Sequence, residues 1–315
     1  MQCQVCQSGK TKIIRARLRY NIKRKVYRCS VCGYVFLDPR KKKDREFYTG
    51  NNYRRLYGST PNKISKCHEI FNTYLPFQDL IIKEIGHILK LDMKVLDVGC
   101  STGHFLHALK GKVKERVGLE LQKDAVSFIR KNLDFKVYSQ SIETTKIKES
   151  HFDLVTCLQV LEHIENPLVF LNGLAKNLKP DGYLYLEVPN VNDVLLTCYK
   201  VAGYADFYFR EPHISNFSIN SLKILLRRAG FKGVFKTVQR YNIINHLHWI
   251  LTNSPQGAFA AGNQDPVLVV GKEARTGVGK ELNKFIKGVD EKYKKILAKH
   301  DVGENLVFLG KKLSK

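Results

Sequence analysis

The sequence predicts an α/β fold in which a parallel sheet with helices on both faces follows a small cysteine-containing module. Three observations support this. Short apolar segments alternate with helical patterns from residue 93 onward, two pairs of cysteines stand near the N-terminus, and 315 residues suffice for one large domain plus a small one. Strands alternating with helices at this spacing form parallel sheets, so we expect strands at 94–98, 116–119, 136–138, 152–157 and 182–188.

Composition narrows the class of protein. A chain that is 43% hydrophobic and 26% charged is neither collagen-like, mucin-like nor fully disordered. It shows no signal-peptide pattern and no apolar run of the roughly 18 to 20 residues that would cross a bilayer, so we expect a cytoplasmic protein. The net charge is +24, and residues 1–50 alone carry 14 basic and 3 acidic side chains. This imbalance favours an anionic partner, namely nucleic acid, an anionic lipid surface or a phosphate-bearing substrate; a solvated lysine-rich surface is the alternative.

The four N-terminal cysteines form two pairs, each with a two-residue gap. Cys3 and Cys6 make the first pair, and Cys29 and Cys32, followed by Gly33, make the second. Two such knuckles place four thiolates around one zinc ion, with residues 13–28 between them as a short hairpin. A disulfide pair is the alternative, which a cytoplasmic location disfavours. Since four thiolates leave no open coordination position, the predicted zinc is structural.

The segment 39–57 combines the basic run 40–43 with four aromatic residues. We interpret it as a linker and docking surface. Basic residues interleaved with aromatic ones also bind single-stranded nucleic acid, which is the alternative.

The first predicted strand, 94–98, runs into a glycine-containing loop before a helix that begins near His104. Gly99 and Gly103 permit a sharp turn and the close approach of a ligand. The loop lacks the glycine pattern of the dinucleotide fingerprint. Instead, Asp97 stands at the tip of this strand and Glu120 at the tip of the next, where an acid accepts the hydroxyls of a ribose. Each acid alone is equally well a cap or a solvated turn; together they predict a nucleotide-type cofactor.

Three segments carry a resemblance to a known family: 95–105 (VLDVGCSTGHF), 152–164 (FDLVTCLQVLEHI) and 178–183 (LKPDGY). In order and spacing they resemble the motifs of class I S-adenosylmethionine-dependent methyltransferases. The likeness covers about 94–271 and extends to bacterial enzymes of ubiquinone and sugar pathways. It implies a doubly wound, seven-stranded Rossmann-like methyltransferase sheet and S-adenosylmethionine as cofactor.

The resemblance also implies a set of cofactor-binding residues. The amino-acid part of the cofactor would lie against Asp97 and the loop, its ribose against Glu120, and its adenine against the segments after the second and third strands. Gln159 would lie beside the sulfonium. The full predicted set is Asp97, Gly99, Cys100, Ser101, Gly103, Glu120, Leu121, Ser141, Ile142, Glu143 and Gln159.

His213 is the predicted catalytic residue. The segment 210–218 resembles a stretch of deoxysugar C-methyltransferases in which the matching histidine is a proposed general base. This chain departs from that stretch because Pro212 stands where the family has Glu. A cap on the helix that begins near Ser218 is the alternative role. For His163 we expect positioning rather than catalysis.

The C-terminal part predicts a helix at 219–229, a strand at 233–239, a last strand at 266–271, and an amphipathic helix across 282–297. The insertion 241–264 would close an acceptor pocket or pack over the sheet edge. The amphipathic helix would dock on the protein body, or else contact an anionic membrane. The predicted domains are a zinc-binding module (1–45), a linker with helices (46–92), the methyltransferase domain (93–272), and a C-terminal helix with a basic tail (273–315).

The predicted function is methyl transfer from S-adenosylmethionine to a hydroxyl or a carbon of a sugar, a nucleotide-sugar or a surface glycan. The predicted partner is thus a small-molecule or glycan substrate that bears phosphate. One alternative is an RNA methyltransferase that grips nucleic acid with its basic N-terminal module. Another is a cofactor-binding scaffold without turnover.

Overall fold

A computed structural model describes residues 1–38, 67–257 and 259–313. The chain divides into two compact units. Unit 1 comprises Met1–Asp38, Val188–Leu222 and Phe235–Val307, and the described part of unit 2 comprises residues 67–187, 223–234 and 308–313. The predicted linker and nucleic-acid segment at 39–57 lies outside the described residues.

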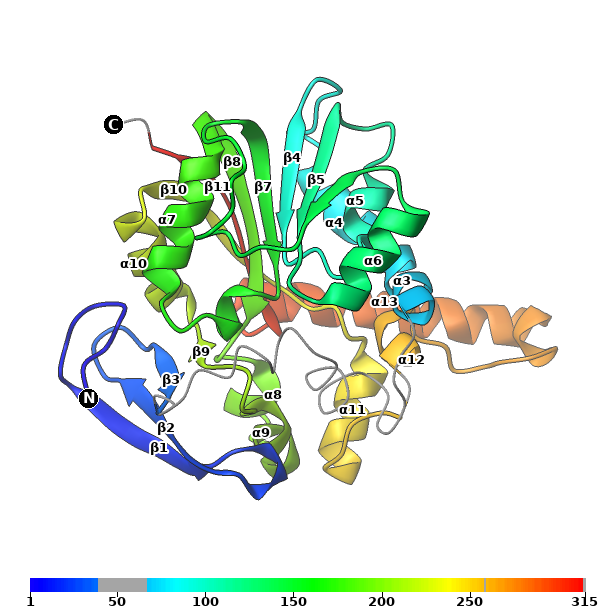
Figure 1. Cartoon of the computed structure of the whole chain (residues 1–315). Helices are drawn as coiled ribbons and strands as arrows, with labels where there is room; N and C mark the ends of the chain where they lie inside the picture. Colours follow the sequence, from blue (N-terminus) through cyan, green and yellow to red (C-terminus); the bar gives the residue numbers. More distant parts are fainter. Residues whose placement is uncertain (39–66, 258, 314–315) are drawn as a thin grey trace. The chain divides into compact units, whose positions relative to one another are not determined.

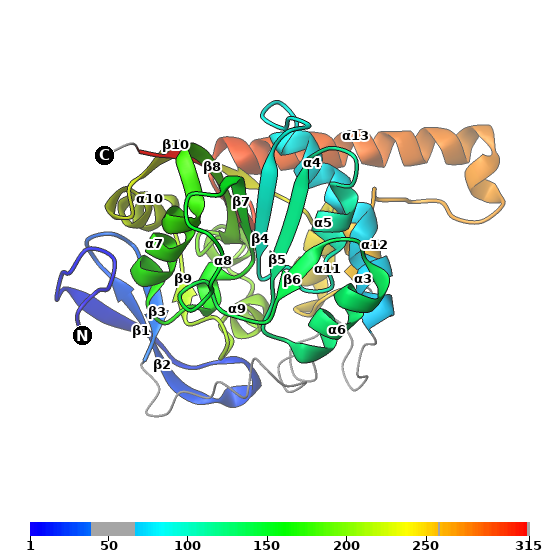
Figure 2. The same cartoon turned by 45° about the horizontal axis from the view of Figure 1, so that its top comes forward.

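Unit 2 is built on a seven-stranded sheet with the order β10-β11-β8-β7-β4-β5-β6 (Figure 1). Neighbouring pairs among β4, β5, β6, β7 and β8 are parallel. Figures 1 and 2 show α7 on one face of this sheet and α4 and α5 on the other. The strands are β4 (Lys94–Val98), β5 (Glu115–Leu119), β6 (Lys136–Tyr138), β7 (Phe152–Leu158), β8 (Leu178–Pro189), β10 (Phe231–Val238) and β11 (Asn305–Lys312), of which the last three continue into unit 1.

The helices of unit 2 follow the strands in the predicted alternation. Asn166 caps α7, since its side chain accepts a hydrogen bond from the backbone N–H of Val169, and Pro167 occupies the first turn, where no N–H is needed. Strands β4 and β7 are buried almost throughout, as expected of central strands covered on both faces. The helices are α3 (Cys67–Tyr74), η2 (Leu75–Phe77), α4 (Gln78–Ile85), α5 (His104–Ala108), α6 (Lys123–Asn132), η3 (Leu161–His163), α7 (Pro167–Asn177) and the end of α10 (Ile219–Arg228).

The five strands predicted between residues 94 and 188 are confirmed, as are the helix at 219–229 and the strand at 233–239. The strand predicted at 266–271 is wrong. Its place in the sheet is taken by β11, which follows the long helix α13 (Gly277–Lys299). The sheet therefore does not end at residue 272.

Unit 1 begins with the predicted hairpin. Strand β1 (Thr11–Arg17) pairs antiparallel with β2 (Lys23–Cys29), and β3 (Val35–Leu37) and β9 (Ser215–Asn216) complete a four-stranded sheet. The remaining elements of unit 1 are η1 (Arg19–Asn21), α8 (Val194–Thr197), α9 (Ala202–Tyr208), α11 (Ile243–Thr252), α12 (Phe259–Asn263), η4 (Glu273–Arg275) and α13.

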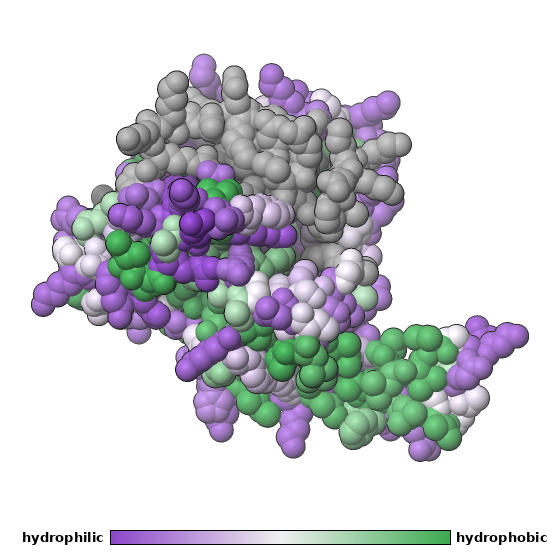
Figure 3. All heavy atoms as spheres, turned by 90° about the horizontal axis from the view of Figure 1, so that it is seen from below, coloured by the Kyte–Doolittle hydropathy of each residue, from purple (hydrophilic) through white to green (hydrophobic). Residues whose placement is uncertain are grey.

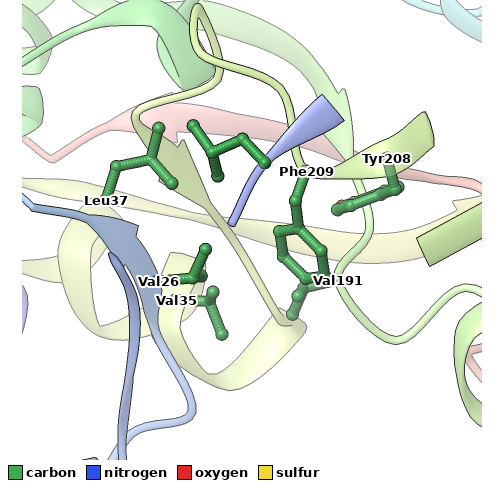
Figure 4. Close-up of a cluster of buried hydrophobic side chains, with 7 residues drawn as sticks. Val26, Val35, Leu37, Val191, Tyr208 and Phe209 are labelled. Atoms are coloured by element: carbon green, nitrogen blue, oxygen red, sulfur yellow. The ribbon is translucent and has the colours of Figure 1, made fainter. Parts of the chain in front are cut away.

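The N-terminal module shares a hydrophobic core with the later segment 188–222. Val26 and Val35 from the module contact Val191 and Phe209 from that segment, as Figure 4 shows. A module of 38 residues buries too little apolar surface to be stable alone. The core that it shares with segment 188–222 adds buried apolar surface.

None of the helices in residues 1–38, 67–257 and 259–313 combines the length and the apolarity needed to cross a bilayer.

Candidate functional site

The loop after β4 has a strained and closely packed backbone. Gly99 and Gly103 both have φ +78°, and Ser101 between them has φ 51°. A Cβ on Gly99 would clash with a methyl group of Val160, and a Cβ on Gly103 would lie 2.6 Å from the ring of Phe135. Glycine is therefore required at 99 and 103 both for the left-handed backbone and for space.

Glu120 ties the end of β5 to this loop. One carboxylate oxygen accepts a hydrogen bond from the backbone N–H of Ser101 at 2.8 Å, and the other accepts one from the backbone N–H of Gln122 at 2.8 Å. The two predicted strand tips thus meet, because the carboxyl ends of adjacent parallel strands share one edge of the sheet.

Asp97 lies beneath the loop and is 3% exposed. Its carboxylate accepts a hydrogen bond from the hydroxyl of Thr156 on β7 at 2.7 Å. Burial raises the pKa of Asp97 to about 7; the Thr156 hydrogen bond lowers it and the charge of Glu120 raises it. The group therefore changes charge near neutral pH.

Sequence reasoning missed Thr156 and Val160. Thr156 is a fully buried polar residue inside the apolar strand β7, and this break in the apolar pattern was the available signal. For Val160 there was no signal, because its contact with Gly99 depends on how the β7 loop returns to the sheet.

Of the other predicted cofactor-binding residues, Cys100 is buried and Gln159 is exposed. Cys100 is buried against Gly118, and burial raises its thiol pKa well above the ordinary value, so the side chain is a packed thiol. Gln159 is exposed and has φ 57°, and its N–H donates to the carbonyl of Glu187. Strained backbone of this kind at a strand end is typical of functional loops.

The residues predicted to meet adenine follow β5, in the case of Leu121, and β6, in the case of 141–143. Leu121 is 39% exposed, and Glu143 is also exposed. Ile142 is buried beside Gly173 of α7, and the Ser141 hydroxyl is 3.0 Å from that of Thr144. Leu121 and Glu143 are therefore accessible to solvent, while Ile142 packs the segment onto α7.

His213 belongs to unit 1 and is 4% exposed. Its Nε2 accepts hydrogen bonds from Arg210 Nε at 2.9 Å and Nη2 at 2.6 Å. Nε2 therefore holds no proton in this arrangement, and its lone pair faces a guanidinium group.

The alternative role of His213 as a helix cap is wrong. Helix α10 is capped by Ser218 and Ser221: the Ser218 N–H donates to the Ser221 hydroxyl at 2.9 Å, and the Ser221 N–H donates to the Ser218 hydroxyl. His163 lies in η3 of unit 2 and has a ring nitrogen 3.8 Å from the Glu162 carboxylate.

The four N-terminal cysteines converge as the spacing predicts. The sulfurs of Cys3 and Cys32 are 3.6 Å apart, those of Cys6 and Cys29 are 3.5 Å apart, and all four lie within 4.8 Å of one another. Four thiolates at ~2.3 Å from one zinc ion stand about 3.8 Å apart, so the cluster has the size of a tetrahedral zinc site. All four cysteines are free, so neither pair forms a disulfide.

The strand order of unit 2, numbered along the chain within the sheet, is 3-2-1-4-5-7-6, and the glycine loop lies at the ends of the adjacent parallel strands β4 and β5. This is the Rossmann-like α/β fold of class I methyltransferases.

A family model described as a methyltransferase domain matches residues 72–235, slightly more than half of the chain. The chain belongs to this family. The match contains the whole glycine loop, Glu120 and Thr156, and it ends before α13.

Curated relatives are similar over a shorter span. The chain is 30% identical over 105 residues to a ubiquinone biosynthesis O-methyltransferase of Aliivibrio fischeri, which is 31% of this chain and 45% of the relative. It is 32% identical over 107 residues to the enzyme of that name from Idiomarina loihiensis, covering 31% and 43%. The chain thus spans a little under half the length of the curated relatives it matches.

Among solved structures, a SAM-dependent methyltransferase from Archaeoglobus fulgidus superposes with a TM-score of 0.48 at 17% identity, covering 75% of this chain and 94% of that one.

Proposed function

We propose that the protein transfers a methyl group from S-adenosylmethionine to a hydroxyl group of a small-molecule or glycan acceptor by direct displacement. The observation that carries this proposal is the junction of Glu120 with the loop at Ser101, inside a segment that belongs to the methyltransferase family. The cofactor supplies an activated methyl group, so the protein has to align the two reactants and receive a proton.

The residues of unit 2 fit this cofactor. Glu120 lies at the end of β5 with its carboxylate at the glycine loop, and a carboxylate accepts two hydroxyl hydrogen bonds at once, which suits a ribose diol. Asp97 would counter the positive charge of the cofactor's amino-acid part, and its burial strengthens that interaction. Leu121 and Glu143 would border adenine, and Gln159 would border the sulfonium.

We propose further that the methyl acceptor is a sugar hydroxyl and that His213 is the general base that removes its proton. It is supported by the likeness of segment 210–218 to sugar methyltransferases and by the basic composition, which suits a phosphate-bearing substrate. Because Arg210 donates to His213 Nε2, accepting a proton there requires this pair to separate when the acceptor binds.

A second candidate acceptor is a phenolic hydroxyl. Its support is that the curated relatives include ubiquinone biosynthesis O-methyltransferases. A phenol ionises more readily than a sugar hydroxyl, so it depends less on a strong base.

Label transfer distinguishes these acceptors. Methyl-labelled S-adenosylmethionine and the protein would be added to a lysate of the source organism, which is then separated into nucleotide sugars, glycolipids, quinone-type lipids and RNA. Label in a sugar-containing fraction supports the proposal, and label in quinone-type lipids supports the phenol. Label in RNA, or no transfer to any fraction, would contradict both.

We further propose that Cys3, Cys6, Cys29 and Cys32 hold a structural zinc ion. The cluster size and the small core of the module support it. Cys29→Ser should release about one zinc equivalent per chain and unfold the module, since such modules draw much of their folding free energy from the metal. Elemental analysis and protease sensitivity of residues 1–38 measure this, with Cys198→Ser, an exposed cysteine outside the cluster, as control. Full zinc content in Cys29→Ser would refute the site.

A further inference from the structure

One part of unit 1 is an arm formed by residues 265–287. The extended segment 265–271 runs back along the first half of α13. Asn283 fastens it by accepting hydrogen bonds from the N–H groups of Leu268 and Val269 and donating to the carbonyl of Val269. Lys287 adds an ion pair with Asp265 at 2.6 Å. These bonds fix the arm as an ordered feature.

The arm exposes an unusual number of large apolar side chains. Six residues within positions 267–285 are at least 40% exposed. Figure 3 shows a continuous hydrophobic strip on the face that contains this arm. The six are Val267, Leu268, Val270, Val278, Leu282 and Phe285. A contiguous apolar surface of this kind on a folded protein marks a site of interaction.

The exposed residues of α13 form a second stripe beside its buried one. Ile286 and Leu297 are buried, as core-facing positions of an amphipathic helix should be. Val278, Leu282 and Phe285 recur at spacings of four and three, so they share another face of the helix, which lies in solvent. Packing within the protein therefore accounts for one apolar stripe of α13 and not for the other.

The arm and the rest of α13 carry an excess of positive charge. Residues 265–299 contain nine Lys or Arg and five Asp or Glu, and the chain as a whole carries +24. Lys292, seven residues after Phe285, is exposed on the same face of α13 as the stripe, whereas Lys280 and Lys284 are exposed on the opposite face. Lysines beside exposed aliphatic and aromatic residues suit an anionic lipid surface, because their stems follow the apolar layer while the ammonium groups reach the headgroups.

We propose that the arm of residues 265–287 docks on an anionic lipid bilayer, with Leu282 and Phe285 inserted among the lipids and Lys292, on the same face of α13, on the headgroups. A second copy of this chain suits the stripe less, since two chains of +24 repel each other. RNA suits it less, since nucleic acid is held by lysines with stacking aromatics and not by aliphatic side chains. This inference goes beyond the proposed function and does not depend on it.

The test is flotation of the full-length protein with vesicles of phosphatidylcholine containing phosphatidylglycerol and with vesicles of phosphatidylcholine alone. The double variant Leu282→Ser/Phe285→Ser removes apolar surface without changing any charge. We expect the wild type to float with the anionic vesicles, and the variant to bind them at least about tenfold less tightly. The matched control, Leu91→Ser/Val234→Ser, changes two side chains that are each 74% exposed elsewhere and should float like the wild type.

A reporter variant tests insertion separately. Trp249 is the chain's single tryptophan and is buried, so its emission should not respond to vesicles. In Phe285→Trp we expect a blue shift of the added tryptophan with anionic vesicles and none with neutral ones.

Several results would overturn the proposal. Equal flotation of the wild type and the serine double variant would show attraction by charge alone. Absence of wild-type flotation, or no blue shift in Phe285→Trp, would exclude insertion. A wild-type dimer that the double variant converts to monomers, seen by light scattering without lipid, would assign the stripe to self-association.

Discussion

Two pairs of neighbouring carboxyl groups, one in each unit, have similar electrostatics and different surroundings. In unit 2, burial raises the pKa of Asp97 to about 7 with Glu120 as its acidic neighbour. In unit 1, burial raises the pKa of Glu304 to about 8 with Asp193 as its acidic neighbour.

The two pairs of carboxyl groups differ in their hydrogen-bond partners. Glu304 accepts hydrogen bonds from Gln239 and from the backbone N–H groups of Arg240 and Tyr241, and Asp193 accepts from the N–H of Leu195 and the hydroxyl of Tyr204. These acids fasten chain segments to one another.

Glu120 also accepts two backbone N–H bonds, but it and Asp97 stand at the ends of parallel strands, beside a loop with left-handed backbone at Gly99, Ser101 and Gly103. A raised carboxyl pKa is therefore not by itself the mark of a site. Position at a strand end and the geometry of the adjoining loop distinguish the Asp97–Glu120 pair from the Asp193–Glu304 pair.

The largest effect is expected from Glu304→Ala. It removes the acceptor of the backbone N–H groups of Arg240 and Tyr241 and one of the partners of the Gln239 amide at a half-buried position, which should lower the free energy of unfolding by on the order of 3 kcal/mol. Chemical denaturation followed by the fluorescence of Trp249, in unit 1, measures this. The exposed Glu143→Ala serves as control. If Glu304→Ala were as stable as the control, the structural role assigned to the unit 1 pair would be wrong.

Gly99→Ala should cost about 2 to 3 kcal/mol of unfolding free energy, because an L-residue at φ +78° is strained and its Cβ clashes with Val160. Gly111→Ala separates the two causes, since Gly111 has φ +74° and, among the described residues other than its chain neighbours, no heavy atom lies within 4 Å of where a Cβ would stand. We expect Gly111→Ala to cost about 1 kcal/mol. Equal costs for the two variants would show that the Val160 contact has no energetic consequence.

A smaller effect is expected in the pH dependence of cofactor binding. The ionised form of Asp97 favours a cation, so binding releases a proton and affinity should rise as pH increases through about 7. If only the ionised form binds, affinity increases roughly tenfold between pH 6 and pH 8. Titration calorimetry at several pH values measures this, and Asp97→Asn should bind weakly with only the cofactor's own pH dependence.

Thr156→Val sharpens the same test. The Thr156 hydroxyl lowers the pKa of Asp97, so its removal should move the midpoint of the affinity profile to higher pH. Thr156→Ser keeps the hydroxyl and should restore the wild-type midpoint. A midpoint that stays the same in Thr156→Val would show that this hydrogen bond does not control Asp97.

The strands of the sheet and the cysteine cluster can be predicted from the sequence because they depend on local patterns of residues. The strands around Asp97 and Glu120 are short apolar runs that end in acids, and parallel pairing brings such ends together without further information. The cysteine cluster is equally local, since each pair is set by a two-residue gap.

The errors come from long-range pairing. Residues 266–271 and 305–312 are both short apolar runs, and nothing in either one shows which will pair in the sheet. The structure chooses the later run as β11, while Val267 and Val270 of the earlier run stay exposed on the arm. The role of His213 is open in the sequence for a different reason, because its contact with Arg210 and the Ser218–Ser221 cap of α10 are local and depend on which way each side chain turns.

The central claim is that Glu120 and the loop of unit 2 bind S-adenosylmethionine. Titration calorimetry of S-adenosylmethionine into the wild type and Glu120→Ala, at equal zinc content, tests it most directly. We predict saturable one-to-one binding by the wild type and a loss of at least about tenfold in Glu120→Ala, since the variant removes the carboxylate proposed to hold the ribose. Equal affinity in the two proteins, or no binding by the wild type, would contradict the account.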